Sequence, residues 1–130
     1  MRTLLLLASF AAACGAQSTA PKLGENIAVR FNEGVRIPSD TTTVRFTAVT
    51  SDSRCPSGAQ CVWAGEATVE FMVGGAQKVT LGLQPGSVAS TAIVGMYQIT
   101  FVALAPYPAV NKTSAKSDYV ATIRFDSAKD

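Results

Sequence analysis

The sequence has no histidine and only three cysteines, and these shortages exclude several kinds of chemistry. Without histidine the chain cannot assemble a Ser-His or Cys-His catalytic pair, and it also lacks the Gly-x-Ser-x-Gly turn of many hydrolases. Three cysteines alone are too few for the four ligands of a structural zinc site. Gly-rich phosphate loops, haem motifs and calcium loops are absent as well. We therefore expect neither a metal nor an organic cofactor.

Charge is also scarce, at 15% of the residues, and no run of one sign occurs. The formal net charge is +2, and loss of Arg2 with an N-terminal leader would lower it by one. Basic and acidic side chains are interleaved along the chain, so no basic stretch is available to follow a phosphate backbone. We expect no nucleic-acid partner.

A pair of facing carboxylates is the catalytic arrangement that this composition leaves open. Asp52, Glu66 and Glu70 are the acids nearest to the two later cysteines. Glu70 alternates with Val69 and Phe71, which places it on the outer face of a strand. Because the sequence offers no other acid–base machinery, we predict that the chain is not an enzyme.

No apolar run approaches the roughly 20 residues that a helix needs to cross a bilayer. The longest, Leu4 to Phe10, follows Arg2 and is itself followed by three alanines and Cys14. A basic residue, a short apolar run and small residues in this order are typical of a secretion signal. The sequence therefore predicts export, with residues 1–13 as the signal peptide.

The segment "FAAACG" resembles a bacterial lipobox, after which the cysteine is diacylated and becomes the new N-terminus. Ala11 stands where that motif more often has Leu, Val or Ile, so ordinary cleavage after Ala13 or Ala16 is the alternative. We predict that Cys14 is lipidated and that residues 14–25 form a flexible tether.

The predicted anchor places the chain in an exported, oxidising compartment. Gly15 follows the cysteine where an aspartate would resemble an inner-membrane retention signal. In a Gram-negative cell we therefore expect the outer membrane, on its periplasmic or surface face. Lipidation of Cys14 uses the odd cysteine, so Cys55 and Cys61 are expected to pair as a disulfide.

From residue 26 to residue 130, apolar and polar residues alternate with the period of a β-strand. The pattern predicts about seven strands, over 27–32, 34–38, 44–50, 67–73, 78–83, 97–104 and 119–125. We predict one antiparallel β-sandwich, Ig-like in general architecture, with a small barrel as the alternative. The glycines at 74 and 75 predict a hairpin. Residues 101–104 are apolar without alternation, which favours a central or doubly covered strand.

Two core strands share a short pattern. "VRFTAV" runs into a proline-bearing segment at 52–56, and "ITFVAL" runs into "APYP" at 105–108. The match is too short for a repeat. It indicates instead that two core strands each end at a proline-bearing loop, at the same end of the sandwich.

Cys55 and Cys61 enclose "PSGAQ", a turn-forming segment that a disulfide would close into a small loop. A crosslink over so few residues contributes about 2 kcal/mol, so its effect is local. The spacing is not the Cys-x-x-Cys of a redox pair. We predict a structural staple.

Arg54 stands just before this loop, with Asp52 two residues earlier and Glu66 after the loop. In a structural interpretation Asp52 accepts backbone N–H groups in the turn, while Arg54 pairs with Asp52 or Glu66 and shields the disulfide. In a functional interpretation the braced loop presents Arg54 to a partner. The sequence leaves both open.

Trp63 and Tyr107 complete the set of candidate binding residues. Trp63 is the only tryptophan and follows Cys61 by two positions. A lone tryptophan at the edge of a sandwich is more often core than contact, so we expect it to be buried against the disulfide, with partner contact as the alternative. Gly65 is expected to kink the backbone. Tyr107 lies between two prolines and is expected to expose its ring.

Taken together, "DSRCP", "CVWAG", "MYQITFVALAPYP" and "DYVATIRF" resemble a group of small, uncharacterised bacterial exported proteins and lipoproteins. The resemblance covers most of residues 44–125. It implies a small β domain and an exported location, and it carries over no catalytic residue.

We therefore predict a non-catalytic cell-envelope lipoprotein that acts as a binding or structural module at the membrane surface. Its expected partners are the membrane, through the lipid anchor, and an envelope protein. The alternative is a secreted protease inhibitor, whose protease partner would contact Arg54 in the braced loop.

Overall fold

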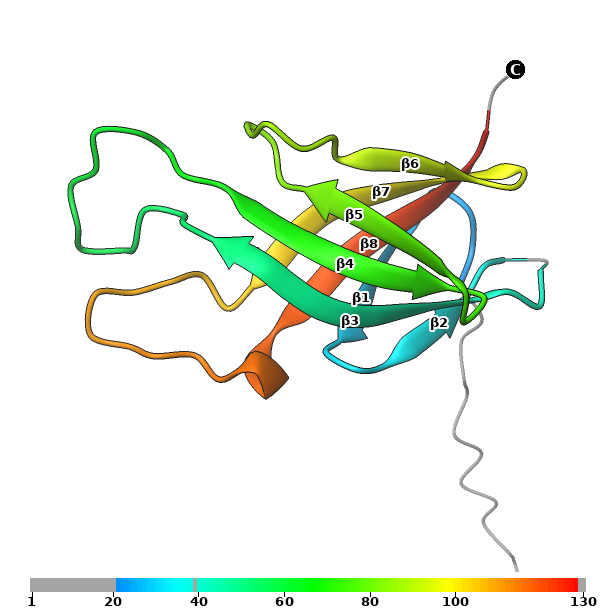
Figure 1. Ribbon diagram of the computed structural model, residues 1–130, viewed down its shortest axis with the longest axis horizontal. Coiled ribbons are helices and arrows are strands. Elements are labelled where there is room, and N and C mark those ends of the chain that lie inside the picture. Colours follow the sequence, from blue (N-terminus) through cyan, green and yellow to red (C-terminus); the bar gives the residue numbers. More distant parts are fainter. Residues whose placement is uncertain (1–20, 39, 129–130) are drawn as a thin grey trace, which may run out of the picture.

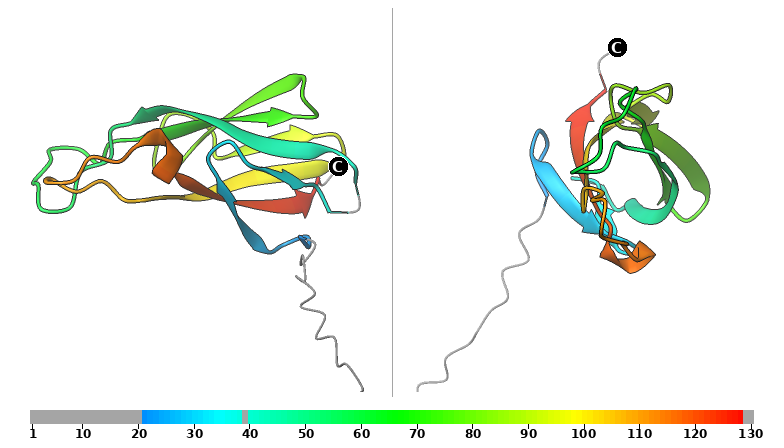
Figure 2. Two further views of the ribbon diagram at one scale, coloured as in Figure 1. Left: turned by 90° about the horizontal axis from the view of Figure 1, so that it is seen from below. Right: turned by 90° about the vertical axis from the view of Figure 1, so that its left-hand side faces the viewer.

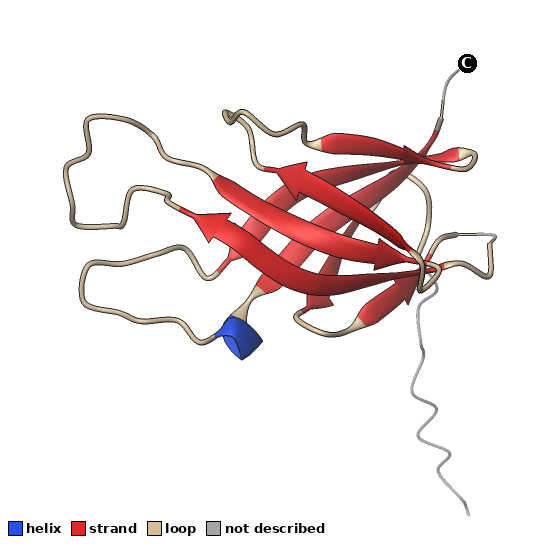
Figure 3. Ribbon diagram, in the orientation of Figure 1, coloured by secondary structure: helices blue, strands red, loops and turns tan. Residues whose placement is uncertain are grey.

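The computed structural model describes residues 21–38 and 40–128 of the chain. These residues form two antiparallel four-stranded sheets packed face to face, with one short helical turn (Figures 1 and 3). The elements are β1 (Asn26–Arg30), β2 (Gly34–Arg36), β3 (Thr43–Asp52), β4 (Ala67–Val73), β5 (Gln77–Gly82), β6 (Thr91–Val94), β7 (Tyr97–Ala105), the helical turn η1 (Lys116–Asp118) and β8 (Val120–Ser127). The predicted β-sandwich is confirmed, and the barrel alternative is wrong.

The topology consists of two meanders. One sheet has the order β2-β3-β4-β5, and the other has the order β1-β8-β7-β6. The chain crosses between the sheets after β1 and again after β5. Apart from the pair β1–β8, neighbouring strands are consecutive in sequence. Short turns join β4 to β5, in the predicted hairpin at Gly74 and Gly75, and β6 to β7, whereas longer connections join β3 to β4 and β7 to β8.

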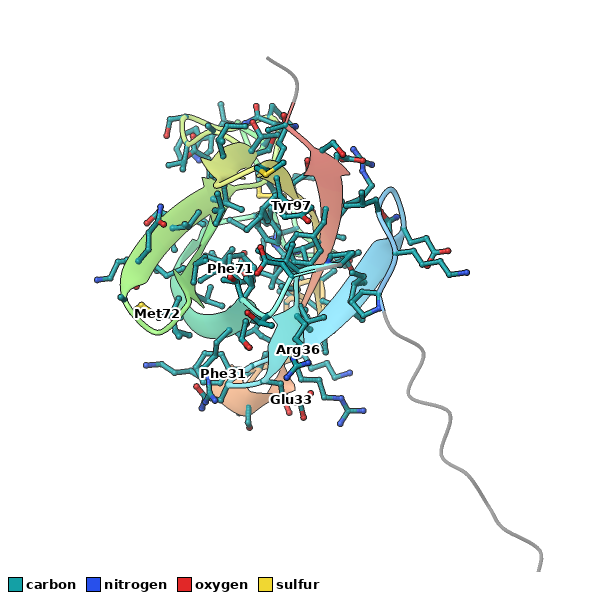
Figure 4. All side chains as sticks on the ribbon, turned by 90° about the vertical axis from the view of Figure 1, so that its right-hand side faces the viewer. Phe31, Glu33, Arg36, Phe71, Met72 and Tyr97 are labelled. Atoms are coloured by element: carbon teal, nitrogen blue, oxygen red, sulfur yellow. A yellow bond between two sulfur atoms is a disulfide. The ribbon has the colours of Figure 1, made fainter. Side chains whose placement is uncertain are left out.

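The core lies between the inner faces of the two sheets, as the alternation predicts. In Figure 4, Phe71 of β4 points between the sheets, while its neighbour Met72 points away from them. Phe71 contacts Phe46 of β3, with ring centroids 5.5 Å apart, and Phe101 of β7, at 6.4 Å. Aromatic rings from both sheets therefore join the two layers.

The strand prediction missed one strand, β6, whose four residues are too few to show an alternation. Strand β7 is central, between β8 and β6, which is one of the two arrangements predicted for it. It is not covered on both faces, because Val102 and Ala103 are exposed. Strand β6 pairs only with Tyr97–Thr100, and a register shift follows between Phe101 and Ala103, so the second half of β7 lacks a strand neighbour on that side.

The long connections lie at one end of the sandwich. Figures 1 and 2 show the β3–β4 connection, residues 53–66, and the β7–β8 connection, residues 106–119, extending beyond the sheets side by side. The β4–β5 and β6–β7 hairpins lie at the other end. The short shared pattern in the sequence thus correctly indicated two core strands that end together.

The N-terminal predictions lie partly outside the described residues, because the signal peptide and Cys14 precede residue 21. The last residues of the predicted tether form a turn, in which Gly24 N–H donates to the carbonyl of Phe125 at 2.8 Å. Strand β1 then begins beside Arg124, the fifth residue of β8, and runs toward Val120, so the chain enters β1 from the side away from residues 53–66. Among the described residues, no helix has the length and apolar character to span a membrane.

Candidate functional site

Residues 53–66 and 106–119 contact each other through their backbones, and we call these two segments together the loop end. Ser57 N–H donates to the carbonyl of Pro108 at 2.9 Å, and Val110 N–H donates to the carbonyl of Ser57 at 3.2 Å. A parallel bridge joins Ser57 to Ala109. Two segments that are about fifty residues apart in sequence are thereby held as one unit.

The predicted disulfide between Cys55 and Cys61 is confirmed, with their Cα atoms 5.9 Å apart. Inside the loop that it closes, Ala59 N–H donates to the carbonyl of Pro56 at 3.1 Å. Gly58 has a positive φ of 89°, a conformation that glycine adopts without a side-chain penalty. The turn residues and the crosslink therefore specify the same local conformation.

The base of the β3–β4 connection is closed by Ser53, Gly65 and Glu66. Ser53 N–H donates to the carbonyl of Glu66 at 2.7 Å, and Glu66 N–H donates to Ser53 Oγ at 3.0 Å. Gly65 has a φ of +72°, and a Cβ atom at this position would collide with the carbonyl of Ser53. The expectation that Gly65 kinks the backbone is confirmed, and the close approach explains why glycine is needed there.

Arg54 is held inside the loop end by four hydrogen bonds. Its Nε and Nη2 donate to the two carboxylate oxygens of Asp52 at 2.8 and 2.9 Å. Its Nη1 donates to the carbonyl of Leu104 at 2.7 Å, and Nη2 donates also to the carbonyl of Pro106 at 3.1 Å. Only 9% of the Arg54 side chain and 11% of the Asp52 side chain are exposed. The planar guanidinium thus joins the end of β3 to the end of β7.

Asp52 receives a further hydrogen bond from the Tyr119 hydroxyl, at 3.0 Å from Oδ2. Partial burial alone would raise the pKa of Asp52, but the hydrogen bonds and charge of Arg54, together with the Tyr119 hydroxyl, outweigh it and lower that pKa. Burial, followed by the hydrogen bond to Asp52, raises the pKa of Tyr119. Asp52 is therefore stabilised as a carboxylate and Tyr119 as a neutral phenol.

The structural interpretation of Arg54 and Asp52 agrees with these contacts, whereas a side chain that is only 9% exposed does not support the alternative in which Arg54 is presented to a partner. A protease-inhibitory loop built around Arg54 needs an exposed side chain, whereas this one is turned inward onto Asp52 and the β7 carbonyls. Glu66 does not pair with Arg54. Its carboxylate instead accepts hydrogen bonds from the backbone N–H and hydroxyl of Ser87, at 2.8 and 2.9 Å.

Tyr107 packs against Arg54 on the side of the guanidinium that faces away from the core. The guanidinium carbon lies 5.0 Å from the centre of the Tyr107 ring, a cation–π distance. The Tyr107 hydroxyl donates to the carbonyl of Cys55 at 2.9 Å. The residue is 56% exposed, so the expectation of an exposed ring is confirmed.

Trp63 is 75% exposed, so the expectation that it is buried against the disulfide is wrong. The strand β4 begins only at Ala67, and therefore Trp63 belongs to the connection rather than to a core-facing strand. Its neighbour Val62 is 94% exposed, and Val110 on the other segment is 57% exposed. Neither valine was identified from the sequence as a candidate binding residue. The absence of charged residues from Cys55 to Gly65 was a signal that this connection exposes apolar side chains.

A shallow groove of about 400 Å³ lies beside the loop end, between the end of β5 and the second half of β7. Leu83 and Pro85 line one side, and Val102 and Leu104 line the other. Tyr107 and Arg54 close it toward the loop end. The groove continues the apolar exposed surface of the loop end onto the edge of β7.

The described ranges, 21–38 and 40–128, contain no group of three His, Cys, Asp or Glu side chains close enough to hold a metal ion. At the loop end, Asp52 is paired with Arg54, and Glu66 is bound to Ser87. The arrangement is suited to non-covalent contact through apolar and aromatic side chains. Comparison with protein-family models, with curated proteins and with solved structures finds no match.

Proposed function

We propose that this protein is a non-catalytic, lipid-anchored cell-envelope protein whose loop end is a binding surface. One observation carries the proposal: Val62, Trp63, Tyr107 and Val110 are all exposed on two segments that are bonded to each other. Large apolar side chains exposed on two loops that are bonded to each other, outside a fold that already has a complete core, are a feature of interaction sites.

The bracing of the loop end supports this function. Binding orders the groups that make contact, and a surface that is already rigid loses less conformational entropy. Here the disulfide, the Ser57 to Pro108 hydrogen bond and the Arg54 contacts hold the backbone beneath the exposed side chains. Because these braces are internal, the side chains above them remain free for contact.

The position of the loop end also suits an anchored protein. The described chain enters β1 from the side away from the loop end, since Asn26 pairs with Arg124 while the last residue, Arg30, pairs with Val120 beside η1. A lipid on Cys14 would therefore attach the domain on the side away from Trp63, and the tether would let the loop end reach a partner.

The binding surface is tested by photo-crosslinking in intact cells of the source organism. A photoreactive amino acid at position 62 is expected to give a specific crosslinked product. The same residue at position 96 is a matched control, because Met96 is also largely exposed, at 80% against 94% for Val62, but lies in the β6–β7 hairpin at the opposite end. Equal products at both positions, or none at position 62, would remove the proposal.

The anchor is tested by mass spectrometry and fractionation of the mature protein. A diacylglycerol on Cys14 and recovery with the membrane fraction are expected. The Cys14→Ser variant should lose both while keeping its fold. If the wild-type protein is recovered free of membranes, with an unmodified N-terminus after Ala13 or Ala16, the anchored function is wrong.

A further inference from the structure

We propose that the partner of the loop end is a lipid bilayer with anionic headgroups, and that Val62 and Trp63 insert into its interface. This inference rests on the proposed function, because it names the partner of the same surface. The following observations concern the shape of the loop end, its lack of charge at the tip and the basic side chains beside it.

Val62 and Trp63 are consecutive residues and are the most exposed apolar side chains of the loop end. They lie on a connection that extends beyond the sheets (Figure 2). From Cys55 to Gly65 the sequence contains no charged residue. Insertion of this segment would therefore bury no charge, and tryptophan is a residue that favours the membrane–water interface.

Two exposed lysines, Lys112 and Lys116, lie on the neighbouring segment of the loop end. Within the described residues neither has an ion-pair partner. Asp118 is the only acid of residues 106–119, and its carboxylate accepts the backbone N–H of Ala115 at 2.9 Å. Exposed apolar residues on one segment and exposed lysines on the segment bonded to it fit an interface in which anionic headgroups contact the lysines while the apolar side chains insert.

Other occupants fit the tip less well. A peptide partner would bind in the groove or along the free edge of the second half of β7, and neither Val62 nor Trp63 lines that groove. A glycan needs free polar groups beside the aromatic ring, whereas the nearby Glu66 carboxylate is already bound to Ser87. A bilayer, by contrast, can take up a projecting apolar loop without a groove or polar groups that match a particular ligand.

The chain is long enough for the anchor and the loop end to contact one membrane. Residues 15–21, which precede the turn at Lys22–Glu25, span at most about 23–25 Å when extended. A strand of eight residues, such as β8, spans about 25 Å. With a lipid on Cys14 the domain would then lie along the bilayer and be held at both ends.

The experiment uses the mature chain, residues 14–130 with Cys14→Ser, so that neither an acyl chain nor the apolar signal peptide contributes to binding. Trp63 is the only tryptophan, so intrinsic fluorescence reports the loop end even where another segment touches the vesicle. Vesicles of phosphatidylcholine with phosphatidylglycerol are expected to shift the Trp63 emission to shorter wavelength, and brominated lipids should quench it. Pure phosphatidylcholine should give a shift only at higher lipid concentration, and added salt should weaken binding to the anionic vesicles.

Matched variants distinguish insertion of Val62 and Trp63 from nonspecific adsorption of the protein to vesicles. Val62→Ser is expected to raise the lipid concentration at half-maximal shift by about tenfold. Lys112→Glu with Lys116→Glu should weaken binding to anionic vesicles and leave binding to phosphatidylcholine unchanged. Met96→Ser, at the opposite end of the sandwich, should change neither.

Each contrary result overturns a different part of the two proposals. If position 62 crosslinks to an envelope protein in cells while Trp63 shows no shift with any vesicle, the bilayer is wrong and the binding surface stands. If neither signal is seen, both proposals are lost. Equal affinity for neutral and anionic vesicles overturns the role of the lysines. Self-association of the Cys14→Ser chain that Val62→Ser abolishes would make a second copy the partner and overturn the bilayer.

Discussion

At the scale of single residues, Arg54 is the centre of the loop end. It neutralises Asp52 and donates to two backbone carbonyls, those of Leu104 in β7 and of Pro106 just after it. An arginine can do this because its guanidinium presents several N–H donors in one plane, whereas lysine presents a single ammonium. Tyr107 then covers the guanidinium from the solvent side.

Arg54→Ala is predicted to lower the free energy of unfolding by about 3 kcal/mol, because it leaves Asp52 and two carbonyls without partners in a buried place. Arg54→Lys should recover only part of this loss. The matched control is Arg124→Ala, since the Arg124–Asp126 pair has the same spacing and a similar distance of 2.9 Å but is more exposed. That variant should cost at most about 1 kcal/mol in urea unfolding. Equal losses would show that burial is unimportant here.

Asp52 is predicted to make folding sensitive to acid. Because its pKa is lower in the folded chain than in the unfolded chain, it contributes stability at pH values above the unfolded pKa. This contribution is lost as the pH falls through the folded pKa, below about pH 4. In urea titrations at several pH values, Asp52→Asn should flatten the acid limb. Asp40→Asn is the matched variant, because the pKa of Asp40 is also lowered in the folded chain, by a hydrogen bond from the Thr42 backbone N–H. It measures how much of the acid limb comes from Asp40 instead. An unchanged acid limb in Asp52→Asn would contradict the role of Asp52.

At the scale of elements, the two segments of the loop end are braced rather than merely exposed. The disulfide closes one segment, the Ser57 bridge joins it to the other, and Gly65 lets the chain return to β4 beside Ser53. These braces are independent of the core, because none of them uses a residue of the inner sheet faces. The loop end and the core are therefore expected to respond separately to substitution.

Gly65→Ala is predicted to be much more destabilising than Gly75→Ala. The two glycines have nearly the same φ, +72° and +74°, so the conformational penalty of a side chain is about 1 kcal/mol in each. At Gly75 no atom lies within 4 Å of the added Cβ, whereas at Gly65 it collides with Ser53. We expect a further loss of about 2 kcal/mol or more in Gly65→Ala, measured by urea unfolding. Similar losses would show that the close approach to Ser53 is absent in solution.

Removal of the disulfide is predicted to have a small global effect. Cys55→Ser with Cys61→Ser should lower the free energy of unfolding by about 2 kcal/mol, because the closed loop is short. Amide hydrogen exchange should increase within residues 53–66 and remain unchanged in β4 and β8. Failure of the double variant to fold would contradict the conclusion that the crosslink is a local staple.

At the scale of the whole molecule, much of the fold was predictable because each core strand alternates with a period of two. Residues such as Phe46, Phe71 and Phe125 are fully buried, as their alternation indicates. Strand β6 escaped prediction because four residues contain too little pattern. The exposure of β7 also escaped, because an apolar run reads the same whether or not its outer face is covered.

The candidate site was predictable only in part. The disulfide and the exposure of Tyr107 followed from local sequence. The inward turn of Arg54 could not be foreseen, because its partners, the carbonyls of Leu104 and Pro106, lie about fifty residues away in sequence. Trp63 was misjudged since tryptophan is usually buried, and the loop that holds it outside the core is defined by tertiary contacts.

The exposure of Trp63 on a folded, braced loop end is the claim on which both proposals depend. Acrylamide quenching of the single tryptophan in the folded Cys14→Ser chain measures it directly, with the same chain in urea as the reference. We predict that folding reduces the quenching constant only slightly, by less than about twofold, in accordance with the 75% exposure. A blue-shifted emission in the folded chain, shielded from acrylamide and released only on unfolding, would contradict the exposed tip and with it the binding surface.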